Sequence, residues 1–327
     1  MKVSIKEIAT KSGVSPATVS LALNGSDLVK TETRDRIVKL AKEMGYHPNP
    51  YARKLVLQKS GMLGLIVPTI RNVFYADLVE FINARARALG YGLIIAASDN
   101  SPDMERKIID EMQDNRVEGI MLAPVNVYNK DFSYINDISV PLIFTTSKYD
   151  GCDQPCVMSD LKQGMISLVE KLTQSGRKAV ALVTGNGGVF ALMQREEGFT
   201  SSFGNTSFEV FRVSRLGYKG GSEAARLILE GKAKFDTVVC VDDMVACGAL
   251  NTLLEHGKSV PNDFWVCGFD DNIFARTAAV PLTSVRQDIE LLAEKTVETM
   301  LTSIEKGEAC DYIVDCELIV RKSALST

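Results

Sequence analysis

Three hydroxyl side chains lie close together near the start of the chain, where they could contact a nucleic acid. They are Ser15, Thr18 and Ser20, and hydroxyls of this kind hydrogen-bond to phosphate oxygens or base edges. Ser15 is also a favoured helix N-cap, and Pro16 is favoured at the first helical position. The segment therefore predicts a helix that begins with free N–H groups, which attract anions. The chemistry that this pattern favours is binding to DNA.

The chain offers little for catalysis or for metal binding. It has only two histidines, His47 and His256, which excludes most general-base and catalytic-triad designs. Its seven cysteines form no CxxC pair, and no GxxxxGK[ST] phosphate loop occurs. We predict a protein that is not an enzyme and that needs neither a metal nor a cofactor.

Three short helices are predicted to position the hydroxyls. Three apolar patterns at helical spacing lie between Ile5 and Met44, with a four-residue turn between the first two. Asn24 and the glycine after it end the second helix, and Thr31 begins the third. Residues 1–45 are thus predicted to form a helix-turn-helix domain. An ordinary three-helix packing module is the alternative.

The distribution of charge supports a polyanion partner for this end of the chain. The 327 residues include 37 basic and 41 acidic side chains, a net charge of −4. Residues 1–60 carry eleven basic and five acidic side chains, a net of +6, and the remainder carries a net of −10. A basic head on an acidic body indicates that the head alone binds the polyanion.

The remainder of the chain alternates apolar stretches with helical patterns. The apolar stretches predict about eight buried strands, from MLGLIVP at 62–68 to WVCGF at 265–269. Nearly all-apolar strands joined by helices indicate parallel sheets covered on both faces. The predicted fold class is α/β, with an all-α helix-turn-helix head and two doubly wound parallel-sheet lobes. Ligands of such sheets bind beyond the carboxyl ends of the strands.

The sequence carries no sign of export or membrane insertion. Its apolar stretches are far shorter than a membrane span, and no apolar signal region follows the charged start MKVSIKEIATKSG. We therefore expect a cytoplasmic protein with reduced cysteines.

Two segments of the head carry a family resemblance. IKEIATKSGVSPATVSLALNG resembles the DNA-binding head of the lactose-repressor (LacI) family of bacterial transcription regulators, and GYHPNPYARKLVLQKS is similar to that family's hinge, here residues 46–61. The resemblance implies that Leu55, with Ala52 one turn before it, wedges into the minor groove of an operator. The alternative for Leu55 is a buried anchor of a small helix.

The same resemblance implies how the head reads DNA. Pro16, Ala17 and Leu21 stand where family members carry base-reading side chains, but they offer only apolar contacts. Reading of the major groove would then rest on thymine methyl groups and on Thr18. The predicted DNA-binding residues are Ser15, Pro16, Ala17, Thr18, Ser20, Leu21, Asn24, Ala52 and Leu55.

The resemblance also covers the body, which is similar to the periplasmic-binding-protein-like core of that family. Four segments carry it: FY at 74–75, REEGF at 195–199, DDMVA at 242–246 and GFDD at 268–271. The match implies a small-molecule effector bound by Phe74, Tyr75, Arg195, Asp242 and Asp270. An arginine and carboxylates suit the hydroxyls of a sugar or sugar phosphate. A purine or a protein coregulator is the alternative.

Each of these residues also has a structural alternative. Arg195 could form an interlobe or surface ion pair, and Phe74 and Tyr75 could belong to the core. Asp242 and Asp270 could cap helices that follow strands. Asp242 also stands where the family usually has asparagine, which implies a different effector specificity.

The resemblance implies an allosteric repressor that binds a palindromic operator as a homodimer. Three crossings between lobes are expected, which place about 62–158 and 285–315 in one lobe and 159–284 and 318–327 in the other. No leucine heptads follow the last strand, which favours a dimer over a tetramer. A solute-binding protein that shares the body but requires export is a remote alternative.

Overall fold

The structure is a computed structural model that describes residues 3–23, 25–46, 60–125, 132–177, 179–186, 189–203, 207–231 and 234–324. The chain divides into two compact units, Met1–Ser60 and Gly61–Thr327, which we call the head and the body. None of the helices in the described ranges combines the length and the apolar character that a membrane span requires.

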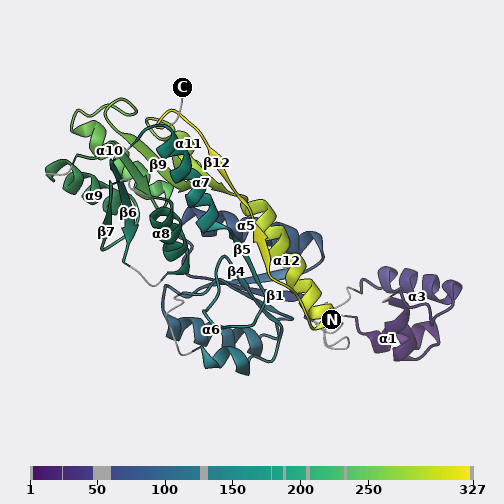
Figure 1. The fold of residues 1–327 in the computed structure, drawn as a ribbon. Coiled ribbons are helices and arrows are strands. Elements are labelled where there is room, and N and C mark those ends of the chain that lie inside the picture. Colours follow the sequence, from purple (N-terminus) through teal and green to yellow (C-terminus); the bar gives the residue numbers. More distant parts are fainter. Residues whose placement is uncertain are drawn as a thin grey trace. The chain divides into compact units, whose positions relative to one another are not determined.

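The described part of the head forms three helices, α1 (Ile5–Ser12), α2 (Pro16–Leu23) and α3 (Thr31–Glu43), of which Figure 1 labels α1 and α3. Ser4 and Glu7 form a reciprocal capping box that begins α1. The three helices bury a small apolar core that includes Ile8, Val19 and Ile37, none of which is exposed. The helical spacing of apolar residues therefore identified this domain correctly.

The turn between α1 and α2 is one residue shorter than the sequence predicts. Because α1 ends at Ser12 and α2 begins at Pro16, three residues connect them. Gly13 takes the left-handed conformation, with φ of 71°, which glycine adopts without a steric penalty. The left-handed Gly13 ends α1 and leaves a short turn before α2.

The body contains two six-stranded sheets, one in each lobe. The first lobe has the strand order β11-β5-β4-β3-β1-β2, and the second has β12-β10-β9-β8-β6-β7. The strands of the first sheet are β1 (Met62–Val67), β2 (Gly92–Ala97), β3 (Ile120–Leu122), β4 (Leu142–Thr145), β5 (Cys156–Ser159) and β11 (Tyr312–Val314). Those of the second are β6 (Ala179–Gly185), β7 (Ser207–Val213), β8 (Thr237–Cys240), β9 (Trp265–Asp270), β10 (Thr283–Gln287) and β12 (Cys316–Ile319).

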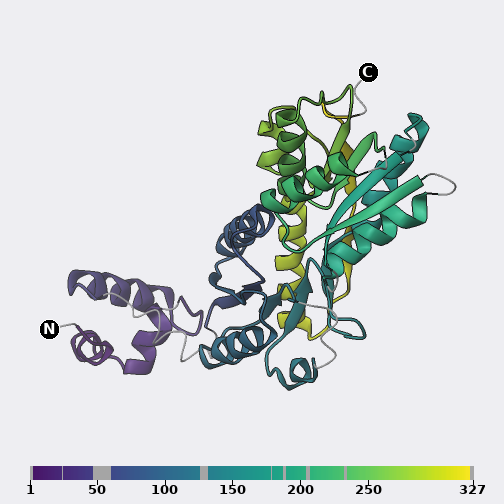
Figure 2. The same cartoon turned by 90° about the vertical axis from the view of Figure 1, so that its left-hand side faces the viewer.

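Helices cover both faces of each sheet (Figures 1 and 2). In the first lobe α5 (Val73–Ala88) and α12 (Ile289–Lys306) pack on one face, and α6 (Pro102–Asp114) and the 3-10 helix η1 (Ser133–Asp137) pack on the other. In the second lobe α7 (Leu161–Gln174) and α8 (Phe190–Ser202) lie opposite α9 (Tyr218–Glu230), α10 (Asp243–Glu255) and α11 (Ile273–Thr277). Double coverage explains why the strands are almost wholly apolar, and it confirms the predicted fold class.

The pairing is parallel throughout except at β12, which runs antiparallel to β10 with Val285 opposite Leu318. Four strands, β5, β10, β11 and β12, were not recognised as strands from the sequence. Each is five residues or shorter and includes at least one charged or hydroxyl side chain. A short strand with polar side chains has little apolar alternation, and so local periodicity marks it weakly.

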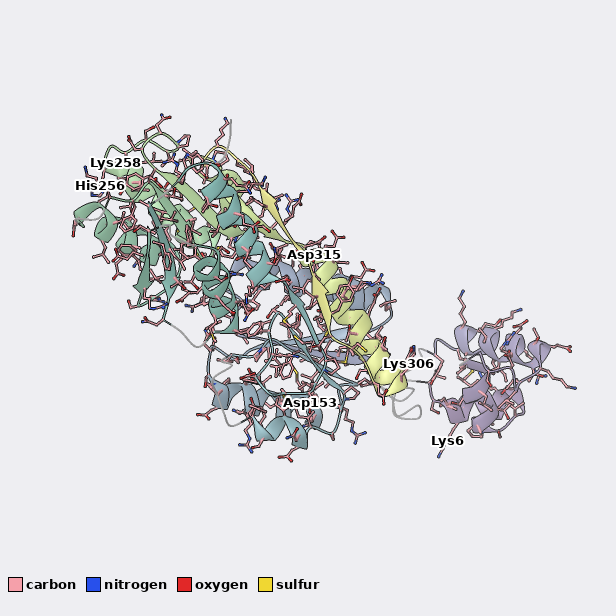
Figure 3. All side chains as sticks on the ribbon, in the orientation of Figure 1. Lys6, Asp153, His256, Lys258, Lys306 and Asp315 are labelled. Atoms are coloured by element: carbon pink, nitrogen blue, oxygen red, sulfur yellow. The ribbon has the colours of Figure 1, made fainter. Side chains whose placement is uncertain are left out.

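The chain crosses between the lobes three times, at Asp160, at Asp288 and at Asp315. Figure 3 labels Asp315, where β11 passes into β12. The second crossing lies later than the expected boundary at Val285. Residues 283–287 still pair with β9 and β12 in the second sheet, and the chain returns to the first lobe only with α12. The long-range pairing of β10 decides this boundary, and the local sequence does not reveal it.

Candidate functional site

A cavity of about 410 Å³ lies between the two lobes of the body. Its walls include Pro68 after β1, Pro124 after β3 and Asp242 after β8. Because β1 lies between β2 and β3, and β6 lies between β7 and β8, strand order reverses at β1 and at β6. Doubly wound sheets bind ligands at such points, and this volume is typical of small-molecule sites.

The structure brings together all five residues predicted to contact an effector, since each of them lines this cavity. They come from different elements of the two lobes: Phe74 and Tyr75 from α5, Arg195 from α8, Asp242 from the start of α10, and Asp270 from the end of β9. Their placement follows from topology, because the ends of parallel strands meet at one edge of a sheet.

Arg195 and Asp270 form a buried ion pair. Arg195 Nη2 donates to Asp270 Oδ1 over 2.9 Å, and Nη1 donates to the carbonyl of Val241. The guanidinium also lies 4.1 Å from the centre of the Phe269 ring. Arg195 thus forms an ion pair, but the pair is buried within the second lobe, and so the alternative of an interlobe or surface pair is wrong.

The carboxyl group of Asp270 is poised to change charge near neutral pH. Burial raises its pKa to about 6, against the opposing effect of Arg195, and the nearby carboxylate of Asp242 raises it further. Gln287 Nε2 also donates to Oδ1 over 2.7 Å. One carboxylate oxygen thus holds two side chains of the cavity wall in place.

Two of the structural alternatives also describe real contacts. Asp242 caps α10, because its side chain accepts the N–H of Val245 over 2.7 Å. Phe74 belongs to the apolar core of the first lobe and packs edge-to-face on Tyr75, with ring centres 5.3 Å apart. Asp270 caps no described helix, since Asn272 caps α11. Asp242 and Phe74 thus have structural contacts and also line the cavity.

Helix α2 presents an exposed edge in the head. Ser15, Pro16, Ala17 and Leu21 are exposed, whereas Thr18 and Ser20 are half-buried. The Ser15 hydroxyl accepts the N–H of Thr18 over 3.1 Å, which confirms the predicted N-cap, and lies 2.8 Å from Thr18 Oγ1. The two hydroxyls are therefore already paired with each other. Asn24, Ala52 and Leu55 lie outside the described residues.

Comparison with known proteins decides the family. Residues 4–49 match the model of bacterial regulatory proteins of the lacI family, and residues 169–324 match a periplasmic binding protein-like domain. The chain is 30% identical over 332 residues to the probable HTH-type transcriptional repressor ExuR of Bacillus subtilis (strain 168). The aligned region covers 98% of each protein. The chain belongs to the lacI family.

Solved structures share the fold of this lacI-family protein. The lac repressor dimer bound to operator and the anti-inducer ONPF superposes with a TM-score of 0.90 at 21% identity, covering 100% of both chains. A complex of the transcriptional regulator CelR with cellobiose has a TM-score of 0.74 at 24% identity, covering 99% of this chain and 100% of the other. The lacI-family chain is a DNA-binding transcriptional regulator and not an enzyme.

Sequence reasoning missed several residues of the regulator's cavity. Asn100, Thr146 and Gln287 line it. Asn100 and Thr146 have positive φ, of 58° and 67°, and so does Asp270 at 99°. Positive φ is a genuine outlier for a β-branched residue such as Thr146, and strained backbone of this kind gathers at functional sites. The position of Thr146 directly after an apolar strand is the signal that could have found it.

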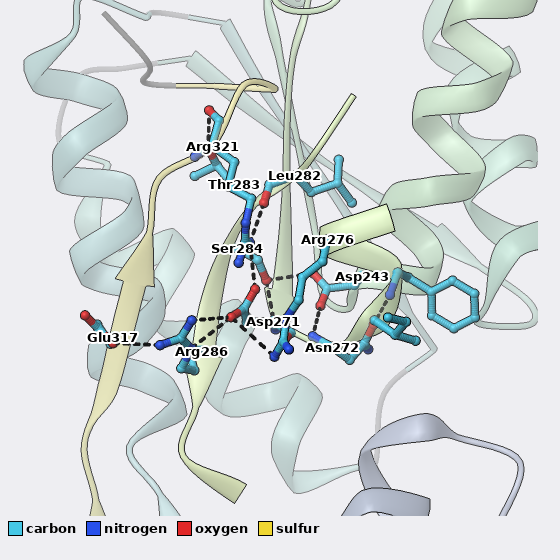
Figure 4. A network of polar contacts seen from close by, with 12 residues as sticks. Asp243, Asp271, Asn272, Arg276, Leu282, Thr283, Ser284, Arg286, Glu317 and Arg321 are labelled. Carbon is cyan, nitrogen blue, oxygen red and sulfur yellow. Dashed lines mark hydrogen bonds and ion pairs between the residues drawn. The ribbon is translucent and has the colours of Figure 1, made fainter. Parts of the chain in front are cut away.

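A polar network fixes the loop that carries Asp270 in the regulator (Figure 4). Next to it, the fully buried carboxylate of Asp271 forms ion pairs with three arginines. Its oxygens lie 2.8 Å from a guanidinium nitrogen of Arg286, 2.6 Å from one of Arg321 and 3.8 Å from one of Arg276. These arginines come from β10, from the segment after β12 and from α11. The network therefore ties the residue after β9 to β10, to α11 and to the segment after β12.

A second buried network supports the first-lobe wall. The side chain of Glu105 is fully buried in α6 and accepts hydrogen bonds from the hydroxyls of Tyr134 and Tyr149 and from the N–H of Val125. Burial raises the pKa of Glu105. Because Val125 lines the cavity, this carboxyl group positions one residue of the first-lobe wall.

Proposed function

We propose that this regulator is a cytoplasmic, dimeric repressor that binds a palindromic operator and responds to a sugar or sugar phosphate in the interlobe cavity. The observation that carries the proposal is the combination of an exposed recognition-helix edge on a basic head with a polar cavity between two doubly wound lobes. A cellobiose complex of a structural neighbour supports a carbohydrate effector.

In the head, Ser15, Pro16, Ala17, Thr18, Ser20 and Leu21 would contact the operator, together with Asn24, Ala52 and Leu55. Two heads in a dimer would present a net charge of about +12 to the DNA, from +6 on each chain. The acidic body would be repelled by the same DNA. This separation of charge confines the DNA contacts to the heads.

In the body, Arg195 and Asp270 would bind sugar hydroxyls, Asp242 would accept a further hydrogen bond, and Phe74 and Tyr75 would face the ring. Closure of the lobes around the effector would change the equilibrium between the DNA-binding and free states. The sign of the response depends on which state the effector binds more tightly.

Selection of binding sites from random DNA with the full chain, followed by gel shifts, tests the first part of the proposal. We expect enrichment of a palindrome and binding that weakens steeply with salt. Enrichment of no palindrome at moderate salt would contradict it. A thermal-shift panel of sugars, sugar phosphates and purines tests the effector class, and stabilisation by purines alone would replace the carbohydrate.

A further inference from the structure

A buried carboxyl group joins three separate segments of the first lobe. Glu105 lies in the first turn of α6, and its side chain is fully buried. Its Oε1 accepts hydrogen bonds from the hydroxyl of Tyr134 over 2.7 Å and from that of Tyr149, and its Oε2 accepts the N–H of Val125 over 3.0 Å. Tyr134 belongs to η1, Val125 follows β3, and Tyr149 follows β4. Segments that lie 20 to 44 residues from Glu105 in the sequence thus meet at one side chain.

These hydrogen bonds make the network rigid. Burial of a carboxyl group is costly unless hydrogen bonds inside the protein replace those to water. A buried network whose members are all bonded in this way holds the surrounding structure in one arrangement. Loss of one bond therefore leaves a polar group without a partner in the core of the first lobe.

Two of the three segments carry residues of the cavity wall. Val125 lines the cavity, and so do Thr146 and Ser147, which directly follow β4. Tyr149 lies two residues beyond Ser147. Glu105 therefore holds one wall residue directly and two others through Tyr149, although its own side chain is buried behind the wall.

The segment after β4 contains a strained residue that is held from both sides. Thr146 has φ of 67°, and a β-branched residue keeps such a conformation only where its surroundings impose it. Its N–H donates to the carbonyl of Val157 in β5 over 2.8 Å. Before it, the hydroxyls of Thr145 and Thr296 lie 3.0 Å apart and tie the end of β4 to α12. After it, the hydroxyl of Tyr149 ties the segment to α6.

We propose that Glu105 is a positioning residue of the effector site, which acts through Tyr149 and Val125 to hold the first-lobe wall and the strained backbone of Thr146 in place. This inference rests on the proposed role of the cavity as the effector site. A wall that is ordered before the effector arrives avoids the entropy cost of ordering it on binding. Loss of the network therefore weakens effector binding although every residue that lines the cavity remains.

Hydrogen exchange of the full chain without a ligand, followed by mass spectrometry, tests the network. Tyr149→Phe keeps the ring and removes one hydrogen bond to Glu105, whereas the control Tyr312→Phe removes an exposed hydroxyl in β11. In Tyr149→Phe we expect about tenfold faster exchange in peptides that cover 120–125 and 142–149, and unchanged exchange in a second-lobe peptide that covers 190–199. Tyr312→Phe should exchange like the wild type in all three peptides. Equal acceleration of the three peptides in Tyr149→Phe, or of none, would overturn the proposal.

Combination with Thr146→Gly tests whether the network sustains the strain. Glycine takes positive φ without a steric penalty, and so this change relieves the strain at its source. We expect Tyr149→Phe to accelerate exchange of 142–149 by a smaller factor together with Thr146→Gly than alone. The same factor in both backgrounds would show a hydroxyl that only stabilises the core, and would overturn its role in positioning Thr146.

Two changes at Glu105 test the centre of the network. The amide of Glu105→Gln can still accept the N–H of Val125 and donate to a tyrosine oxygen, whereas Glu105→Ala leaves all three donors without an acceptor. We expect slower exchange of 120–125 in the glutamine variant than in the alanine variant. Equal exchange in the two would show that hydrogen bonds from this side chain do not hold Val125. If the alanine variant fails to fold, the comparison of Tyr149→Phe with Tyr312→Phe still decides.

Calorimetry with D-glucose, D-ribose and cellobiose connects the network to the effector. A sugar that binds the wild type should bind Tyr149→Phe about tenfold more weakly and Tyr312→Phe equally well. Undiminished affinity in Tyr149→Phe would show that the ordered wall does not contribute to binding, and would overturn the proposal. If none of the three sugars binds the wild type, that result counts against the carbohydrate effector, and the exchange measurements still decide whether Glu105 orders the wall.

Discussion

Arg195 and Asp270 are joined by a hydrogen bond of 2.9 Å between Nη2 and Oδ1, and both side chains are more than nine-tenths buried. Because removal of one partner leaves the other buried without compensation, we expect Arg195→Ala to lower the free energy of unfolding by about 3 kcal/mol. Urea denaturation at neutral pH measures the loss.

The matched control is Arg212→Ala, which breaks an ion pair with Glu196 that is partly exposed. Exposed pairs contribute about 1 kcal/mol or less, so this variant should retain nearly all of its stability. Equal losses in the two variants would show that burial does not distinguish the two pairs, contrary to our interpretation of the cavity.

The raised pKa of Asp270 predicts a dependence of stability on pH. The folded protein holds this proton up to about pH 6, whereas the unfolded chain releases it near 3.8. Protonation of Asp270 therefore stabilises the folded state fully below about pH 3.8. This stabilisation is lost as pH rises through about 6, and the free energy of unfolding falls by about 3 kcal/mol in total. In Asp270→Asn, which cannot ionise, this slope should disappear.

Urea unfolding of the wild type and of Asp270→Asn across this pH range isolates the effect, because the other titrating groups are common to both proteins. The difference in stability between them should change in favour of the variant as pH rises. A difference that stays constant would mean that Asp270 titrates alike in the folded and unfolded chains.

Close packing of α9 on α10 predicts a severe effect at Gly221. A Cβ at this position would overlap the carbonyl of Val245 in α10. We expect Gly221→Ala to destabilise the protein by about 2 kcal/mol or more, although alanine is the better helix former. Glu223→Ala, at an exposed position of the same helix, should change stability by no more than about 0.5 kcal/mol. Thermal unfolding distinguishes the two.

The proposed minor-groove wedge predicts a loss of DNA binding without a loss of folding. Leu55→Ala should weaken binding to the selected operator by more than about tenfold, since wedges of this type stabilise bent DNA. Leu227→Ala makes the same change at an exposed site on α9 and should leave operator affinity unchanged. Gel shifts measure operator affinity and thermal unfolding measures stability in both variants. Parallel loss of affinity and stability in Leu55→Ala would reject the wedge.

The sequence by itself determined the head helices, most of the strands and the residues worth testing. Periodicity identified the three helices of the head, because Ile8, Val19 and Ile37 must share one small core. Apolar stretches identified eight of the described strands, because helices cover both faces of each sheet and leave those strands almost wholly apolar. The basic excess of residues 1–60 and the family resemblance indicated DNA binding. All of these signals depend on neighbours close in sequence or on composition.

Only the tertiary structure decided which of these residues meet and what holds them. Arg195 and Asp270 are 75 residues apart, and their pairing depends on the order of β6, β8 and β9 in the sheet. The lobe boundary after Gln287 also depends on contacts between distant segments, because β10 pairs with β9 and β12. Pairings over such separations leave no local pattern, because burial and sheet order are properties of the folded chain.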